Sequence, residues 1–214
     1  MKKFICLAAA VMMLLGCAAA EEAATEIWQH EAGWINFSVA ITQEGADEVW
    51  EQAATIFGES VGIPMTGDML KSGVLQGHTL ENDVEILGVE GNRITGKKAD
   101  GTELFSHEYS LAEVMEEEGI MDGKKVYVFR TEEAGAGKYT YLLMTEPVRA
   151  ENETAGYTTF NLVCTENGNY RDLFDTEKAE TAVQICAMIN HDAGTEGLAY
   201  AVQKMFASPV VISK

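Results

Sequence analysis

The chain has 214 residues, and its 15 lysine and arginine residues against 34 aspartate and glutamate residues give a formal net charge of −19. A surface this acidic repels nucleic acids and anionic lipid headgroups, so nucleic acid is excluded as a partner. Hydrophobic residues make up 47% of the chain, which is enough for one domain with a core of its own.

The first residues are typical of an export signal. Lys2 and Lys3 precede an apolar run over 4–15 that is short for a membrane span. The sequence Leu-Leu-Gly before Cys17 is similar to a bacterial lipobox, which predicts cleavage at that point and a lipid on the Cys17 thiol. The run of alanines over 18–20 also suits an ordinary signal peptidase, so this alternative stays open.

These signals divide the chain into three parts. We expect a signal peptide at 1–16, an acidic tether at 17–26 and a single domain at 27–214 that ends in a helical segment. Both cleavage alternatives place the protein outside the cytoplasm, either lipid-anchored in the bacterial cell envelope or free in the periplasm or medium.

The expected helices lie near the two ends of the domain. Helical spacing of apolar residues predicts a helix over 46–57 and a further turn over 65–71. Ser110 and Glu113 match a capping box, which predicts a short helix over 111–118. Near the C-terminus we expect two more helices, from 175 or 176 to about 190 and from 195 to 206.

Strands fill the middle of the domain. Alternating or β-branched runs joined by tight turns predict strands at 84–89, 93–97, 103–109, 124–131, 138–145 and 157–164. A meander with this many strands closes into a barrel or a sandwich, so the fold class is mainly β, antiparallel, with flanking α-helices at both ends.

The last strand has two unlike faces. One face carries Phe160 and Leu162, whereas the other carries Tyr157, Thr159 and Asn161. This polar face is either the solvated outside of the barrel or the lining of a ligand site at the barrel mouth.

The cysteines left after export are Cys164 and Cys186. Outside the cytoplasm they are able to form a disulfide, and the alternative is two buried thiols, one in a strand and one in a helix.

Motifs for catalysis do not occur in the sequence. There is no Gly-x-Ser-x-Gly, no phosphate-binding loop and no Cys-x-x-Cys, so we do not expect an enzyme. For a metal, the candidate ligands are His78, His107 and Asp83, on the condition that the strands bring them together. The alternative is that each histidine is an ordinary surface or hydrogen-bonded side chain.

A family resemblance follows from the strands. The segments 82–94, 107–109 and 122–129, followed by 138–141 and 157–164, resemble in order the strands of the bacterial periplasmic zinc-binding ZinT (YodA) family. The resemblance spans roughly 30–190 as a pattern of spacing. It implies an exported calycin- or lipocalin-like barrel with flanking helices and a zinc site at one mouth.

The chain departs from that family at the zinc site. The family carries His-Phe-His on its late strand, and the matching residues here are Thr159, Phe160 and Asn161. The expected function is therefore a binding protein for a small polar ligand, or for zinc or another divalent cation held differently, at the barrel mouth. The alternative is a structural lipoprotein that uses its acidic surface to contact a partner, with no ligand.

Overall fold

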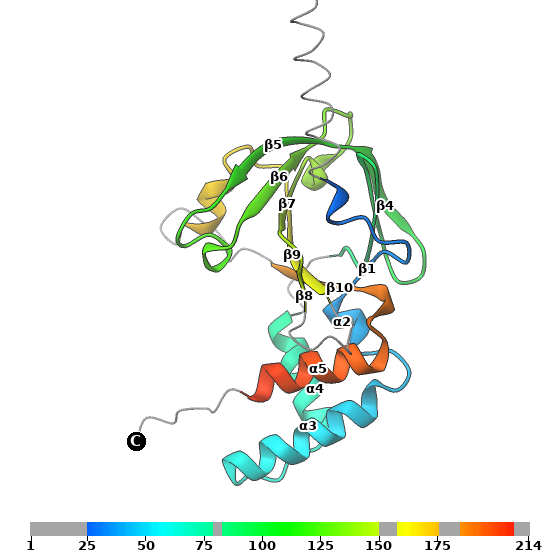
Figure 1. Cartoon of the computed structure of the whole chain (residues 1–214), viewed down its shortest axis with the longest axis vertical. Coiled ribbons are helices and arrows are strands. Elements are labelled where there is room, and N and C mark those ends of the chain that lie inside the picture. Colours follow the sequence, from blue (N-terminus) through cyan, green and yellow to red (C-terminus); the bar gives the residue numbers. More distant parts are fainter. Residues whose placement is uncertain (1–24, 79–82, 150–157, 176–184, 208–214) are drawn as a thin grey trace, which may run out of the picture.

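The computed structural model describes residues 25–78, 83–149, 158–175 and 185–207. Its central element is one antiparallel sheet with the strand order β4-β3-β2-β1-β10-β9-β7-β6-β5, to which β8 adds beside β9 (Figure 1). The strands are β1 Trp34–Asn36, β2 Ile86–Glu90, β3 Arg93–Lys97, β4 Glu103–Glu108, β5 Ser110–Met115, β6 Val126–Arg130, β7 Tyr141–Thr145, β8 Val148–Arg149, β9 Thr158–Thr165 and β10 Cys186–Asn190.

The sheet curls into a nearly closed barrel. The two strands at the ends of the order, β4 and β5, follow each other along the chain and are separated only by Tyr109, so the sheet returns to its own starting edge (Figure 1). Register shifts at Gly96/Lys97 and between Leu111 and Glu113 mark the bends. The expected antiparallel, mainly β barrel with flanking helices is confirmed.

Aromatic and aliphatic side chains fill the barrel interior. Trp28 is fully buried at one end, where its ring meets Tyr127 and Phe129 edge-on and its Nε1 donates to the Thr145 carbonyl at 3.2 Å. The Trp28 carbonyl in turn accepts from Trp34 Nε1 at 2.7 Å. The segment before β1 is thus fixed into the barrel by two tryptophans.

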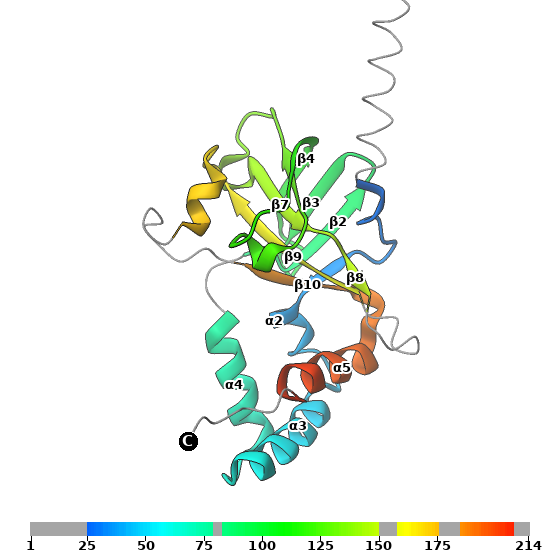
Figure 2. The same ribbon diagram turned by 60° about the vertical axis from the view of Figure 1, so that its left-hand side comes forward.

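Four helices form a layer outside the barrel, beneath β1 and β10 (Figure 2). They are α2 Phe37–Ala40, α3 Ala46–Val61, α4 Gly67–His78 and α5 Gly194–Ala207. The expected helices over 46–57, 65–71 and 195–206 are confirmed, and the first two extend further than expected. None of the helices in the described parts of the chain has the length and apolar character needed to cross a bilayer.

The helix expected over 111–118 is wrong, because Ser110–Met115 form strand β5. The capping-box partner Glu113 does not turn back to the backbone. Its carboxylate accepts from Arg171 Nη1 at 3.0 Å, from Arg171 Nη2 and from Tyr170 Oη at 2.5 Å, and these donors lie in the 3-10 helix Tyr170–Phe174. A long-range ion pair replaces the local cap.

The helix expected up to about 190 is also wrong at its end. Cys186–Asn190 form β10, which pairs with β1 and β9, while 176–184 lie outside the described residues. Met188 faces the barrel interior and Ile189 faces the helices, so the strand is apolar on both sides. A short run that is apolar on both faces has no hydrophobic periodicity, so its sequence does not distinguish a strand from a helix.

The Glu113 contacts give a pH-dependent prediction. Hydrogen bonds from Arg171, then Tyr170, lower the pKa of Glu113 from 4.5 to about 2. Because the pKa is lowered, the contacts stabilise the fold above pH 4.5, and this stability is lost as the pH falls toward 2. We expect Glu113→Gln to lower the free energy of unfolding near neutral pH by about 1 kcal/mol or less, since the groups are partly exposed.

Urea unfolding at neutral pH and in acid measures this effect. The difference between the variant and the parent chain should shrink between pH 4.5 and 2. Glu118→Gln, at an exposed position, is the matched control. It should leave the free energy of unfolding unchanged both at neutral pH and in acid. A Glu113→Gln difference that stays constant down to pH 2 would contradict the assignment.

Candidate functional site

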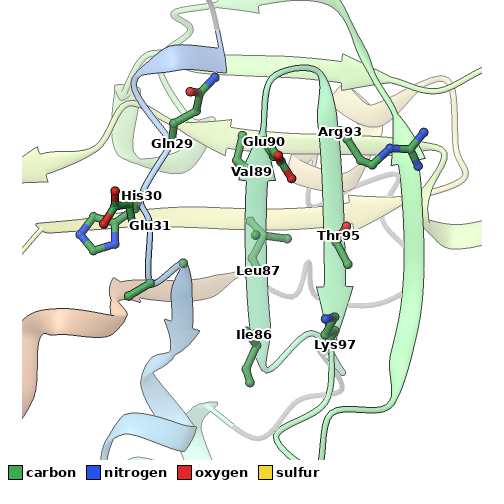
Figure 3. A pocket seen from close by; sticks show the side chains of 13 residues that line it. Gln29, His30, Glu31, Ile86, Leu87, Val89, Glu90, Arg93, Thr95 and Lys97 are labelled. Atoms are coloured by element: carbon green, nitrogen blue, oxygen red, sulfur yellow. The ribbon is translucent and has the colours of Figure 1, made fainter.

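A groove of about 540 Å³ opens between the segment before β1 and the outer face of β2 and β3 (Figure 3). This volume falls in the range of small-molecule sites. The groove is lined by Gln29, His30, Glu31, Ala32, Gly33, Ile86, Leu87, Gly88, Val89, Glu90, Arg93, Thr95 and Lys97.

The groove exists because the chain turns away from β2 at Gly33. Gly33 has φ +74°, its N–H donates to the His30 carbonyl at 2.8 Å, and its carbonyl accepts from His191 N at 2.9 Å. A side chain here would be strained, and its Cβ would lie 2.9 Å from the Leu87 carbonyl oxygen. Consequently β1 begins to pair with β2 only at Trp34, opposite Leu87.

Charges of both signs line the groove. Glu90 and Arg93 face each other across the hairpin end of β2 and β3, and Lys97 lies at the opposite end (Figure 3). Arg93 is already engaged, because its Nη2 donates to Glu108 at 3.2 Å. Lys97 makes no ion pair with any residue that the structure describes. The groove thus offers carboxylates and a free ammonium group to a ligand.

His30 is the residue of this groove with an unsatisfied polar atom. Its Nε2 lies 3.5 Å from Asp192 Oδ2, whereas its Nδ1 is buried and has no hydrogen-bond partner within the described part of the chain. A buried polar atom without a partner costs free energy unless a ligand or water satisfies it. His30 is not among the site residues expected from the sequence.

The expected metal ligand His107 lies on β4 and faces the barrel interior, opposite Ile94. Its Nδ1 is 3.0 Å from Glu133 Oε2, and Glu133 Oε1 accepts from the Glu108 N–H at 2.8 Å. The hydrogen bond from the Glu108 backbone, then that from His107, lowers the pKa of Glu133. The pair fixes the orientation of the imidazole.

Asp83, the second expected ligand, has other partners. Its Oδ2 accepts from Lys138 Nζ and from Tyr139 Oη, both at 2.8 Å. Burial raises the pKa of Asp83, but these two hydrogen bonds outweigh it and the pKa is lowered. Phe105 lies between the two sites, since its ring stacks on Tyr139 at 4.4 Å and on His107 at 6.3 Å.

The third expected metal ligand, His78, is the last residue of α4, and the position of its side chain lies outside the described residues. Over the described ranges no group of three or more His, Cys, Asp or Glu side chains is placed to hold a metal ion. Coordination by His78, His107 and Asp83 stays a prediction.

The polar face of β9 looks away from the barrel interior. Phe160 and Leu162 pack inside, and Thr159 lies opposite Ile189, which packs against the helices. Asn161 lies on the same outer face as Thr159, and its N–H donates to Thr145 Oγ1 at 2.8 Å. For Thr159 and Asn161 this position agrees with the alternative of an outer polar face, whereas Tyr157 lies outside the described residues. A ligand role for these residues stays a prediction.

The two cysteines are free thiols in neighbouring strands, β9 and β10. Cys186 Sγ lies 3.4 Å from Met188 Sδ, and burial raises the pKa of Cys186 to about 12. Burial also raises the pKa of Cys164. The structure therefore agrees with the two-thiol alternative, except that Cys186 lies in a strand and not in a helix.

Comparison with known proteins finds a relationship at the level of fold. No protein-family model and no curated protein sequence matches the chain. Among solved structures, Zn(II)-bound AdcA from Streptococcus pneumoniae matches with a TM-score of 0.51 and 15% identity, over 84% of this chain and 35% of that one. The Zn(II)-bound ZinT-like domain of the same protein matches with a TM-score of 0.49 and 15% identity, over 82% and 88%.

The match to AdcA shows that this chain has a similar fold at a low level of sequence identity, and the chain spans about a third of the length of the AdcA chain. The groove beside β2 is identified from the structure of this chain, and no role for it is taken from these matches.

Proposed function

We propose that the chain is an exported, non-catalytic binding protein that uses the groove beside β2 to hold a small charged ligand. The observation that carries this proposal is the groove itself, a cavity of about 540 Å³ with carboxylates in its lining and a Lys97 that is unpaired among the described residues. A concave site with a few placed polar groups is typical of small-ligand binding.

The lining favours binding over catalysis. Thr95 is the hydroxyl side chain of the groove, and its Oγ1 is 3.0 Å from Ser106 Oγ, with no histidine in contact. A hydroxyl nucleophile needs a base within hydrogen-bond reach. The groups present suit recognition of opposite charges on a ligand.

A divalent cation is the second candidate ligand, and His107 favours it. AdcA, whose fold is similar, is described as Zn(II)-bound. When Glu133 accepts from His107 Nδ1, the Nε2 lone pair is left for a metal, as in carboxylate–histidine–metal arrangements. This chain would have to supply the other ligands by moving side chains, because Asp83 is occupied by Lys138 and Tyr139.

Thermal unfolding of the exported chain with a panel of amino acids, short peptides, dicarboxylates and divalent metal salts tests the proposal. A ligand held at a hundred times its Kd stabilises the native state by about 2.7 kcal/mol. Lys97→Glu should remove the shift, whereas Lys98→Glu, outside the groove lining, should retain it. If no compound in the panel raises the melting temperature, the alternative of a structural lipoprotein without a ligand gains support.

The same panel separates the two candidates. A Zn²⁺ shift that survives Lys97→Glu and disappears in His107→Asn would support a metal site in the barrel. An organic ligand whose shift disappears only in Lys97→Glu would support the groove.

We also infer that a lipid on Cys17 anchors the protein in the cell envelope. The support is the Leu-Leu-Gly-Cys sequence and the acidic tether that follows it, of which only residues 25 and 26 are described. We expect Cys17→Ser to move the protein from the membrane fraction to the soluble fraction of cells. Unchanged partitioning would favour cleavage by an ordinary signal peptidase and a free extracytoplasmic protein.

A further inference from the structure

Strand β2 has one paired edge and one edge that is partly open. It pairs with β3 along its whole length, from Ile86 opposite Lys97 to Glu90 opposite Arg93. On the other edge it pairs with β1 only at Ile86 and Leu87. Beyond Leu87, the turn at Gly33 leaves the groove in the place where the next stretch of β1 would lie (Figure 3).

The backbone of Val89 opens onto this groove. Gly91 and Asn92 form a two-residue hairpin loop, in which the closing pair Glu90 and Arg93 exchange hydrogen bonds. Because the direction of backbone groups alternates along a strand, Gly88 also faces β3 and Val89 faces the opposite way. No backbone hydrogen bond joins 29–32 to 88–90 across the described groove.

The groove has a carboxylate at one end and an ammonium group at the other. Glu90 lies at the hairpin end, where the neighbouring Arg93 is paired with Glu108. At the other end is Lys97, and between them lies Gly88, where an added Cβ would meet no atom within 4 Å. The absence of a side chain at Gly88 leaves an open path from the Lys97 ammonium to the groove floor.

We propose that the groove binds a short peptide with free ends, which adds to β2 as an antiparallel strand. Its middle residue exchanges two hydrogen bonds with Val89, its amino terminus lies near Glu90 and its carboxylate lies over Gly88, within reach of Lys97. This inference rests on the proposed function and specifies its ligand class. The peptide runs in the direction of β1 and continues that strand beyond the Gly33 turn.

Size and pairing both favour a peptide over a single amino acid. The free edge spans Gly88 to Glu90, roughly 10 Å at about 3.4 Å per residue, which matches a tripeptide. An amino acid is too short to contact both charged ends and has no peptide group to pair with Val89. Addition of a strand to an open edge is an established mode of peptide recognition.

Calorimetric titration of the exported chain with trialanine tests the inference. We expect binding that weakens at least tenfold when the peptide ends are acetylated and amidated, and at least tenfold when the middle nitrogen is methylated. Methylation removes the N–H that would pair with Val89 and leaves the charges unchanged.

Two variants locate the peptide. Gly88→Val places a branched side chain in the open space of a strand, where the fold tolerates it, and should weaken trialanine binding at least tenfold with an unchanged melting temperature. Lys97→Gln should also weaken binding, and Lys98→Gln is its charge-matched control. Equal affinity for trialanine and its N-methylated form would overturn the inference.

The outcome also separates this inference from the proposed function. If trialanine does not bind but an amino acid or a dicarboxylate does, and Lys97→Glu abolishes that binding, the peptide inference fails and the groove remains a ligand site. If no compound binds in the groove, both fail.

Discussion

Trp28→Ala is expected to lower the free energy of unfolding by about 3 to 5 kcal/mol, the usual cost of removing a large buried aromatic side chain. Trp28 is fully buried and contacts Tyr127 and Phe129 at centroid distances of 4.8 and 5.4 Å. Its loss leaves a cavity at one end of the barrel and an unpaired Thr145 carbonyl. Urea denaturation of the variant and the parent chain measures the difference.

Trp28→Phe is the matched control for this prediction. Phenylalanine keeps an aromatic ring in the barrel but cannot donate to Thr145, so its cost should be much smaller than that of alanine. A destabilisation by Trp28→Ala below about 1 kcal/mol would show that the side chain does not occupy the barrel.

Gly96→Ala is expected to destabilise the fold by about 1 to 3 kcal/mol through overpacking. A Cβ at this position would lie 2.2 Å from the Phe105 ring, which is itself buried and stacked on Tyr139 at 4.4 Å. The ring therefore has to leave its stacked position. Equilibrium unfolding in urea gives the cost.

Gly88→Ala on the neighbouring strand is the control for Gly96→Ala. Both glycines lie within strands, but a Cβ at Gly88 meets no atom within 4 Å. The control should be neutral or stabilising, because alanine reduces the entropy of the unfolded chain. In a Phe105→Leu background the cost of Gly96→Ala should fall, and an unchanged cost would contradict the contact.

Local patterns in the sequence were sufficient for much of the barrel. The alternating segments at 84–89 and 93–97 predicted β2 to within two residues and β3 to the residue, because a strand with one buried face shows its period directly. The short strands β1 and β8 were not predicted, and β5 and β10 were predicted as helices. In β5, Glu113 pairs with Arg171, 58 residues away, and in β10 both faces are buried, so neither strand carries a local signal.

The groove could not be predicted from the sequence, for a different reason. It depends on which edge of β2 lacks a partner, and this follows from the position of β1 between β2 and β10. Gly88 within a strand, and Gly33 directly before Trp34, were the signals available, since glycine in a strand marks a bend or a close approach. For Thr159 and Asn161 the sequence left both alternatives open, because alternation along β9 shows that two faces differ but not which face looks into the barrel.

Amide chemical-shift mapping of the ¹⁵N-labelled chain, titrated with the ligand that gives the largest thermal shift, tests the central claim most directly. The account predicts that the largest changes fall on the amides of Gly33, Gly88, Val89 and Glu90, around the groove. Changes confined to His107 and Glu133 in the barrel, or to Thr159 and Asn161 on its outer face, would contradict it.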